Sequence, residues 1–407
     1  MRRVDTKVRL AVTGMGVICS IGKNQKEVWA SIEGCKDGIG PLSKFPGETF
    51  PTDIAAEVAQ ELPLEFLSKG EKKRLSRTDL MAVVAVDEAI KQANESGSAF
   101  QRDRAIVCTG SSTGGLLEGE SYYFKRMVRG RLKTAASSVL QQPTSGPSDA
   151  LARIFELEGG VFSNATACAS AGAAIGMAAD YLRSGHADVA LAGGSDALCR
   201  LTYSGFNVLQ AVDSNPCSPF DASRKGITLG EGAAYLVIER WDDAVGRGAG
   251  ILAELCGYGA SCDAHHPTAP AEDGRGAFAA MTRAMMESEV TPDQVQYVNA
   301  HGTGTLLNDS AETRAILATL GDGVPVSSTK SYFGHTLGAS GALESVITIL
   351  ALQHQVAPPT LRLRAAAEDC TLDYIPHTPR KLEMQNAISN TFGFGGSNVS
   401  LLFRRSA

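Results

Sequence analysis

Two kinds of apolar segment alternate along the 407-residue chain. Short apolar runs are typical of buried strands, and longer segments with apolar residues three or four positions apart are typical of helices packed on a sheet. Short turns with glycine and polar residues separate them, so the pattern predicts an α/β fold with buried sheets and no linker between independent domains. The expected strands are residues 8–12, 105–109, 189–192, 233–239, 251–258, 296–299, 324–327, 386–389 and 399–404, and the expected helices are residues 24–34, 79–94, 169–182, 276–289, 310–320 and 339–353.

The predicted helix 169–182 differs from the others because small and apolar residues cover nearly all of its surface before Asp180. Such a helix is buried on nearly all sides, and Cys168 stands at its first turn. Unpaired N–H groups and the positive end of the helix dipole favour a thiolate, which is the nucleophilic form of cysteine. A tight turn from strand to helix would also direct the sulfur outward. The alternative is an inert buried cysteine, and this segment alone does not decide between the two.

Composition and charge narrow the classes of function. Apolar residues make up 43% of the chain and charged residues 20%, which predicts a large core and argues against wholesale disorder. The net charge of −6 argues against nucleic acid as the main partner. The nine cysteines include no C-x-x-C pair, so neither a disulfide framework nor a zinc ribbon is expected. The sequence has no signal-peptide pattern and no apolar run of about 18 residues, so we expect a cytoplasmic protein without a membrane span.

Several glycine-containing segments are expected to be turns, at 13–16, 110–115 and 193–195. Gly14 and Gly16 suggest a dinucleotide-binding turn, but Cys19 occupies the place of the third glycine of that fingerprint. The segment 110–115 lacks the Gly-Lys-Ser/Thr ending of a phosphate-binding loop. We therefore expect no cofactor, and we expect segment 110–115 to line a pocket or a subunit contact.

Three further turns carry ionisable groups beside glycines or small residues. The first holds Cys168, the second His301, and the third Lys330 and His335. Neutral imidazole N–H groups can stabilise an oxyanion or an enolate, which would suit a cysteine nucleophile. A zinc site is the alternative for one cysteine and two histidines, but neither an H-x-x-x-H pattern nor paired cysteines support it, so we expect no metal.

In their order along the chain, these motifs resemble those of the β-ketoacyl-acyl carrier protein synthases, the condensing enzymes of fatty acid and polyketide synthesis. The resemblance covers nearly the whole chain, and it implies a thiolase-like αβαβα fold of two similar halves, normally in a dimer. We place these halves at residues 1–255 and 256–407. The matching motifs are VTGMG at 12–16, TACAS at 166–170, GEGA at 230–233, NAHGTGT at 299–305, STK at 328–330, GHTLGA at 334–339 and FGFGGSN at 392–398.

The resemblance also implies catalytic roles. Cys168 would accept the acyl chain from an acyl carrier protein as a thioester. His301 and His335 would assist loss of carbon dioxide from malonyl-carrier protein and stabilise the resulting enolate. Lys330 and Glu344 would form a buried charged pair beside the histidines, because buried charges need such pairing. The enolate would attack the acyl thioester and give a 3-ketoacyl product two carbons longer.

Further positions are assigned by the same resemblance. The backbone N–H groups of Phe394 and of the nucleophile would form the oxyanion hole, and Phe394 would also be the gate between the nucleophile and the malonyl side. Thr113 would line the acyl pocket. Lys72, Lys73 and Arg77 would form a basic patch that binds the acidic carrier protein, since a basic face on an acidic enzyme attracts an acidic partner.

The sequence leaves two pathways open. One is fatty acid chain elongation by a homodimer. The other is a type II polyketide or aryl polyene pathway, possibly with a chain-length-factor subunit as the dimer partner. Thr113 and the aromatic, basic and aperiodic segment 118–133 are compatible with either. The intact cysteine and histidines argue against a non-catalytic partner subunit, and thiolase chemistry would need a second cysteine where Phe394 stands.

Overall fold

The computed structural model describes residues 8–45, 50–58, 61–128, 130 and 136–406. An eleven-stranded sheet organises this part of the chain. Its strands are β1 (Leu10–Cys19), β4 (Ala105–Gly110), β5 (Gly160–Asn164), β6 (Val189–Asp196), β7 (Gly232–Arg240), β8 (Ala253–Cys262), β9 (Tyr297–Asn299), β10 (Pro325–Ser327), β12 (Asp373–Tyr374), β14 (Asn386–Gly393) and β15 (Ser397–Arg405). The short strands β2 (Gly40–Pro41), β3 (Ile54–Ala55), β11 (Val356–Ala357) and β13 (Arg380–Lys381) form two separate pairs. The helices are α1 (Gln25–Glu33), α2 (Lys69–Lys72), α3 (Arg77–Ala93), α4 (Leu116–Tyr123), α5 (Gly146–Ile154), α6 (Ser170–Arg183), α7 (Arg200–Val208), α8 (Trp241–Gly246), α9 (Arg275–Ser288), α10 (Leu306–Leu320), α11 (Lys330–Phe333) and α12 (Ser340–His354).

The pairing of the strands is the same in two parts of the sheet. The first part has the order β5-β4-β6-β7-β1 and the second has the order β10-β9-β14-β15-β8. In each part the first three strands are parallel and the last two pair antiparallel. The parts meet where β1 pairs with β8. This repeat gives the fold two similar halves, while their division after residue 255 stays a prediction because β8 spans that residue.

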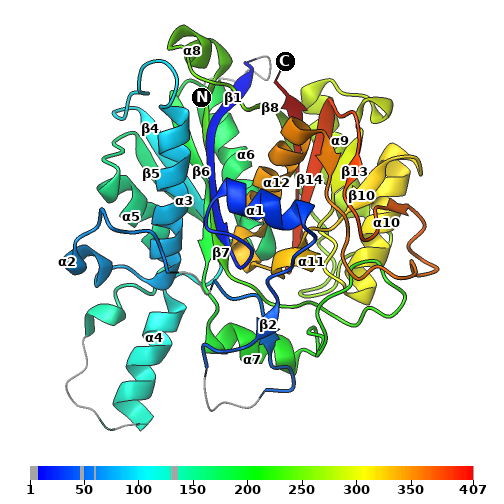
Figure 1. Cartoon of the computed structure of the whole chain (residues 1–407), viewed down its shortest axis with the longest axis horizontal. Coiled ribbons are helices and arrows are strands. Elements are labelled where there is room, and N and C mark those ends of the chain that lie inside the picture. The colour runs from blue at the N-terminus through cyan, green and yellow to red at the C-terminus, as the bar shows by residue number, and fades with distance from the viewer. Residues whose placement is uncertain (1–7, 46–49, 59–60, 129, 131–135, 407) are drawn as a thin grey trace.

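The helices lie in three layers around the two halves of the sheet (Figure 1). In the middle layer, α6 contacts β6 and β15, and α12 contacts β7 and β14, so each helix packs against both halves. On the outer faces, α3 and α5 cover the first half, and α9 and α10 cover the second. Separate apolar clusters fill the spaces between layers, with Ile175 and Ile347 in the middle, Val83 on one side and Met281 on the other. The predicted αβαβα fold is confirmed.

Two of the predicted glycine turns are wrong, because the strands continue through them. β1 extends to Cys19, and β6 includes residues 193–195. In β1 the glycines let α3 lie directly on the strand. A Cβ at Gly14 would lie 2.1 Å from the Ala89 carbonyl oxygen, and a Cβ at Gly16 would lie 1.9 Å from the Ala85 carbonyl oxygen. These glycines therefore serve close packing of helix on strand.

Side-chain caps explain why two helices start earlier than predicted. α3 starts at residue 77 rather than 79. Ser76 Oγ accepts the Asp79 N–H at 3.1 Å, and the Asp79 carboxylate accepts the Ser76 N–H at 2.8 Å. α10 starts at residue 306 rather than 310, since Thr305 Oγ1 accepts the Asn308 N–H at 3.3 Å. The cap of α10 bears on function because it directly follows the turn that holds His301.

The segment expected to be irregular contains regular structure. α4 is followed by a π-helical turn, Phe124–Val128, and together they project from the body of the molecule (Figure 1). The basic residues Arg129, Arg131 and Lys133 of the predicted aromatic and basic segment lie outside the described residues. The last two strands are longer than the predicted 386–389 and 399–404, because β14 continues to Gly393 and β15 starts at Ser397, which leaves a tight hairpin at 394–396.

Candidate active site

A cavity of about 340 Å³ lies beside the start of α6. Cys168, His301, His335 and Phe394 all line it, so turns that are far apart in the sequence meet at one place. Cys168 is 7% exposed and each histidine is 3% exposed, which places them at the deep end of this cavity. The structure thus brings the predicted nucleophile, both predicted histidines and the predicted gate together.

The turn before Cys168 is tight and is held by its neighbours. Ala167 has a φ of +49°, in the left-handed region that costs a residue with a Cβ roughly 1 kcal/mol. Ser112 Oγ donates to the Ala167 carbonyl at 3.0 Å, which holds this conformation. Gly110 lets the end of β4 approach the same turn, since a Cβ there would lie 2.2 Å from the Ala171 nitrogen. The predicted strand-to-helix turn at the cysteine is confirmed.

The acidity of Cys168 differs from the expectation for a helix N-terminus. Burial raises the pKa of the Cys168 thiol to about 11, while the Lys330 charge and a hydrogen bond from the Phe394 backbone act in the opposite direction. The helix N-terminus was expected to favour a thiolate, but at Cys168 the loss of solvent outweighs the favourable field. The backbone N–H groups of Phe394 and of Cys168 itself both interact with the sulfur. Two N–H donors thus face the position where an acyl carbonyl would be attached.

Lys330 connects His301 to a buried carboxylate. Its Nζ donates to Glu344 Oε1 and lies 3.1 Å from His301 Nδ1. The side chains of Lys330 and Glu344 are 1% and 0% exposed, so this ion pair is fully buried. Burial raises the pKa of the Glu344 carboxyl, and the adjacent ammonium opposes that rise. The charged pair is thereby placed directly beside the imidazole of His301.

The hydrogen bonds of the two imidazoles fix their tautomers. Burial lowers the pKa of both His301 and His335 well below the usual range, and the Lys330 charge is the second cause of this shift. Both rings are therefore neutral. His301 Nδ1 accepts from the ammonium, and His335 Nδ1 accepts the Leu337 N–H at 3.0 Å. The proton of each ring is therefore on Nε2. The ring centroids are 5.4 Å apart at an interplanar angle of 89°.

A carboxylate that sequence analysis missed holds the turn of His301. Glu312 on α10 accepts the backbone N–H groups of His301 and Gly302, each at 2.8 Å. It is 1% exposed, and burial raises its pKa to about 7. Asp309, one turn earlier on the same helix, accepts the Gly304 N–H at 3.2 Å. Two acidic residues three positions apart on the buried side of a helix are unusual, and that pattern was the available signal.

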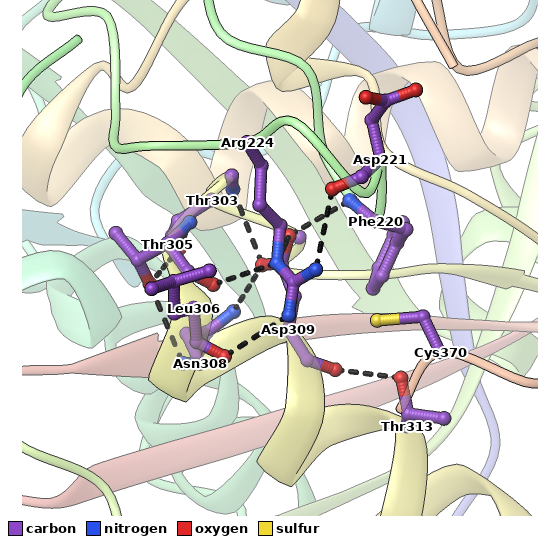
Figure 2. A network of polar contacts seen from close by, with 12 residues as sticks. Phe220, Asp221, Arg224, Thr303, Thr305, Leu306, Asn308, Asp309, Thr313 and Cys370 are labelled. Carbon is purple, nitrogen blue, oxygen red and sulfur yellow. Dashed lines mark hydrogen bonds and ion pairs between the residues drawn. The ribbon is translucent and has the colours of Figure 1, made fainter. Parts of the chain in front are cut away.

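A buried arginine, Arg224, joins the turn of His301 to the loop that contains Phe220 and Asp221 (Figure 2). The Arg224 side chain is 1% exposed and lies 3.6 Å from the Asp309 carboxylate. Its guanidinium donates to the carbonyl oxygens of Asp221 at 3.2 Å, Leu306 at 3.3 Å and Thr305 at 3.4 Å. Asp309 also accepts a backbone N–H from that loop, so the loop and the start of α10 form one rigid unit.

Thr113 does not line the cavity of the nucleophile. Its hydroxyl and its backbone N–H both donate to Asp196 Oδ1 at 2.8 Å. Asp196 is fully buried and also accepts the Gly338 N–H at 2.7 Å, from the turn that precedes α12. Asp196 was missed by sequence analysis, and it links segment 110–115 to the second half of the fold.

The predicted basic patch separates into two kinds of residue. Lys73 is exposed and Lys72 is partly exposed, both at the end of α2. Arg77 instead donates to Glu231 at 2.7 and 3.0 Å and to the Val58 carbonyl at 2.7 Å. The Glu231 side chain is 0% exposed, so Arg77 neutralises a buried charge. The guanidinium of Arg77 is thus engaged by a buried carboxylate, while its side chain is 22% exposed, and its role in docking stays a prediction.

No group of three His, Cys, Asp or Glu side chains within the described ranges could hold a metal ion. All nine cysteines lie in those ranges, and each is a free thiol. Among the helices that the structure describes, none is long and apolar enough to cross a membrane.

Comparison with known proteins identifies the family. Residues 7–244 match the model of the Beta-ketoacyl synthase, N-terminal domain, and residues 252–364 match that of the Beta-ketoacyl synthase, C-terminal domain. The 3-oxoacyl-[acyl-carrier-protein] synthase 2 of Synechocystis sp. is 36% identical over 409 residues, which cover 98% of each chain. Nodulation protein E of Rhizobium meliloti is 37% identical over 98% of this chain and 99% of its own. The solved ishigamide ketosynthase/chain length factor has a TM-score of 0.93 and 31% identity, covering 98% of this chain and 100% of that one. The predicted resemblance is thereby confirmed, and the chain belongs to the β-ketoacyl synthase family.

Proposed function

We propose that this protein catalyses the decarboxylative Claisen condensation of an acyl-enzyme thioester with malonyl-acyl carrier protein in fatty acid chain elongation, in the cytoplasm. The observation that carries the proposal is the cavity in which Cys168 meets two neutral imidazoles, His301 and His335. This arrangement suits a reaction in which a thioester is held on sulfur while negative charge develops on a nearby oxygen.

The first step is acyl transfer to Cys168. The sulfur attacks the carbonyl carbon of the acyl-carrier thioester, and the oxyanion accepts hydrogen bonds from the N–H groups of Cys168 and Phe394. The carbon–sulfur bond to the carrier arm then breaks. The proton of the Cys168 thiol ends on the departing carrier thiol, so the step is balanced.

The second step joins two carbons to the acyl chain. Malonyl-carrier protein loses carbon dioxide, and the electron pair of the broken bond forms an enolate whose oxygen accepts the Nε2–H groups of His301 and His335. The enolate carbon attacks the thioester on Cys168, the carbon–sulfur bond breaks, and the departing sulfur takes a proton from water. The product is a 3-ketoacyl-carrier protein. Neutral donors suit this step because they stabilise the enolate without protonating its carbon.

Lys330, Glu344 and Phe394 act around this chemistry. Lys330 keeps His301 in the Nε2–H tautomer, and Glu344 balances the ammonium charge inside the protein. The ring of Phe394 is 37% exposed and packs on Phe206 with centroids 5.7 Å apart. A partly exposed ring beside the nucleophile is suited to act as the gate between the acyl and malonyl sides.

A second candidate is a ketosynthase subunit of a type II polyketide or aryl polyene pathway. The likeness to the ishigamide ketosynthase/chain length factor favours it. We propose an acyl carrier protein as the partner in either case, with a homodimer for fatty acid elongation and a heterodimer with a chain-length-factor-like subunit for the alternative. Thr113 stays a proposed acyl-pocket residue. Its position in the segment 110–115 is fixed by its hydrogen bond to Asp196.

Acylation followed by product analysis tests this function. Incubation with acyl-carrier protein should add the mass of the acyl group to the peptide of Cys168. Addition of malonyl-carrier protein should then release carbon dioxide and give a 3-ketoacyl product two carbons longer. An acyl group found only on another cysteine would contradict the mechanism. Without a reductase present, further malonyl units on the unreduced product indicate the polyketide alternative. One condensation per chain fits fatty acid elongation and also an aryl polyene pathway, because a polyene needs reduction after each round; the preferred acyl starter then separates these two.

Charge reversal tests the carrier surface. The variant Lys72→Glu/Lys73→Glu should raise the KM for acyl-carrier protein about fivefold and leave kcat unchanged, because exposed charges attract the acidic partner without touching the reaction. The matched control is Lys26→Glu/Lys36→Glu, an equal charge change at two other exposed lysines. An equal rise in KM for both variants would point to net charge rather than to this surface. Arg77 is left unchanged because its loss would leave the buried Glu231 carboxylate with Lys44 as its remaining cationic partner.

A further inference from the structure

Asp196, at the end of β6, is a fully buried carboxylate that two separate segments hold without a cation. Its Oδ1 accepts the hydroxyl of Ser111 at 2.7 Å and both the hydroxyl and the N–H of Thr113 at 2.8 Å. The Ser112 N–H lies 2.9 and 3.0 Å from its two oxygens, and the Gly338 N–H donates to Oδ2 at 2.7 Å. No ion pair among the described residues involves it. A buried charge is costly, so its place in the fold calls for a reason.

One side of this carboxylate leads to the nucleophile. Ser112, whose N–H binds Asp196, donates its hydroxyl to the Ala167 carbonyl at 3.0 Å. Ala167 directly precedes Cys168 and has the left-handed φ of +49°. A single residue therefore connects Asp196 to the strained turn that carries the sulfur.

The other side leads to His335. The peptide that donates to Asp196 is that of Gly338, and the preceding residue Leu337 donates its N–H to His335 Nδ1 at 3.0 Å. Leu337 is left-handed as well, with a φ of +53°. A Cβ at Gly338 would lie 2.7 Å from Asp196 Oδ2 and 2.8 Å from Ser112 Oγ, so the turn of the histidine packs directly on the carboxylate.

We propose that Asp196 is a positioning residue that sets the Cys168 sulfur and the imidazole of His335 at a fixed separation. The inference rests on the proposed function. His301, by contrast, is fixed by Lys330, so Asp196 is the group that ties a histidine to the nucleophile.

The three activities of the site depend differently on that separation. Acylation needs the sulfur and its oxyanion N–H groups, and decarboxylation needs the two histidines. Carbon–carbon bond formation needs both sets in register, because the enolate carbon must reach the thioester carbonyl. A small shift between them should thus affect the last step most.

The variant Asp196→Asn tests this role, because an amide has one acceptor oxygen where the carboxylate has two. Either the Gly338 N–H or the segment 111–113 then loses its acceptor. Condensation should fall about fiftyfold, whereas acylation of Cys168 and decarboxylation of malonyl-carrier protein, assayed separately, should each change less than about threefold.

Asp221→Asn is the matched control. Asp221 is also buried and accepts backbone N–H and hydroxyl hydrogens, but it does not line the active-site cavity. It should lose a similar amount of thermal stability and keep the ratio of condensation to the two partial reactions.

The variant Ser112→Ala tests the link to the nucleophile and leaves the carboxylate in place. It should show the same selective loss of condensation, about tenfold, since the hydrogen bond to Ala167 is gone. The double variant Asp196→Asn/Ser112→Ala should lose little beyond Asp196→Asn, because both substitutions break one connection. Ser112→Ala also carries the test if Asp196→Asn does not fold.

The charge of Asp196 provides a readout that a purely structural role would not move. Burial is the main cause that raises the pKa of the Cys168 thiol, and the Asp196 charge adds to that rise while the Lys330 charge opposes it. At a fixed pH below that pKa, Asp196→Asn should therefore alkylate faster at Cys168 with iodoacetamide, by about threefold, as measured on its peptide by mass. Asp221→Asn should not.

The outcomes separate the inference from the proposed function. An equal loss of all three activities in Asp196→Asn would mean that the residue only supports the fold, and unchanged condensation would also overturn the inference. Fully additive losses in the double variant would overturn the link through Ser112. Failure of the unaltered protein to acylate Cys168 or to decarboxylate malonyl-carrier protein would instead overturn the proposed function.

Discussion

The variant Cys168→Gln should lose condensation by more than about a thousandfold while it still decarboxylates malonyl-carrier protein at the original rate or faster. Without the sulfur, no acyl-enzyme forms and no new carbon–carbon bond can follow. The imidazoles of His301 and His335, however, keep their Nε2–H groups in place for the enolate. Separate assays of released carbon dioxide and of 3-ketoacyl product measure the two activities.

A matched variant controls for the loss of any buried thiol. Cys256 is also buried, at 8% exposure, but it does not line the active-site cavity. Cys256→Ala should therefore retain condensation. Elongation that survives in Cys168→Gln would be incompatible with a nucleophilic role for this residue. A parallel loss of decarboxylation would show that the substitution disturbs the histidines as well.

The variant Lys330→Met should lower condensation at neutral pH by about a hundredfold and destabilise the fold by roughly 3 kcal/mol. The loss of stability follows because Glu344 would remain buried without its cation. The Lys330 charge lowers the pKa of His301 and His335, so its removal lets both imidazoles protonate at higher pH than before. The acid limb of the kcat profile should therefore move to higher pH.

A double variant separates the structural effect of Lys330 from its effect on the histidines. Lys330→Met/Glu344→Leu replaces both buried charges with apolar groups and should recover most of the lost thermal stability. It should not restore the rate or the original pH profile, because the hydrogen bond to His301 Nδ1 is still missing. Recovery of activity together with stability would mean that the pair only supports the fold.

The sequence alone determined the features that depend on local pattern. The alternation of short apolar runs with amphipathic segments was enough for the α/β class, because the two periodicities differ. The helix after Cys168, with small and apolar residues over nearly all of its surface, was predicted as buried, and α6 lies in the middle layer. The order of the motifs was enough for the family, since each motif surrounds a residue whose chemistry allows few substitutes.

Only the tertiary structure decided which distant segments meet. Glycines in turns and glycines under a helix look alike in sequence, so the extension of β1 through Gly14 required the position of α3. Lys73 and Arg77 look equally basic, yet only Arg77 faces the buried Glu231. The pKa of Cys168 depends on how much water the folded chain excludes, which no local pattern records. Burial and long-range pairing are properties of the assembled layers, and they set the acidity, availability and partners of the same side chains.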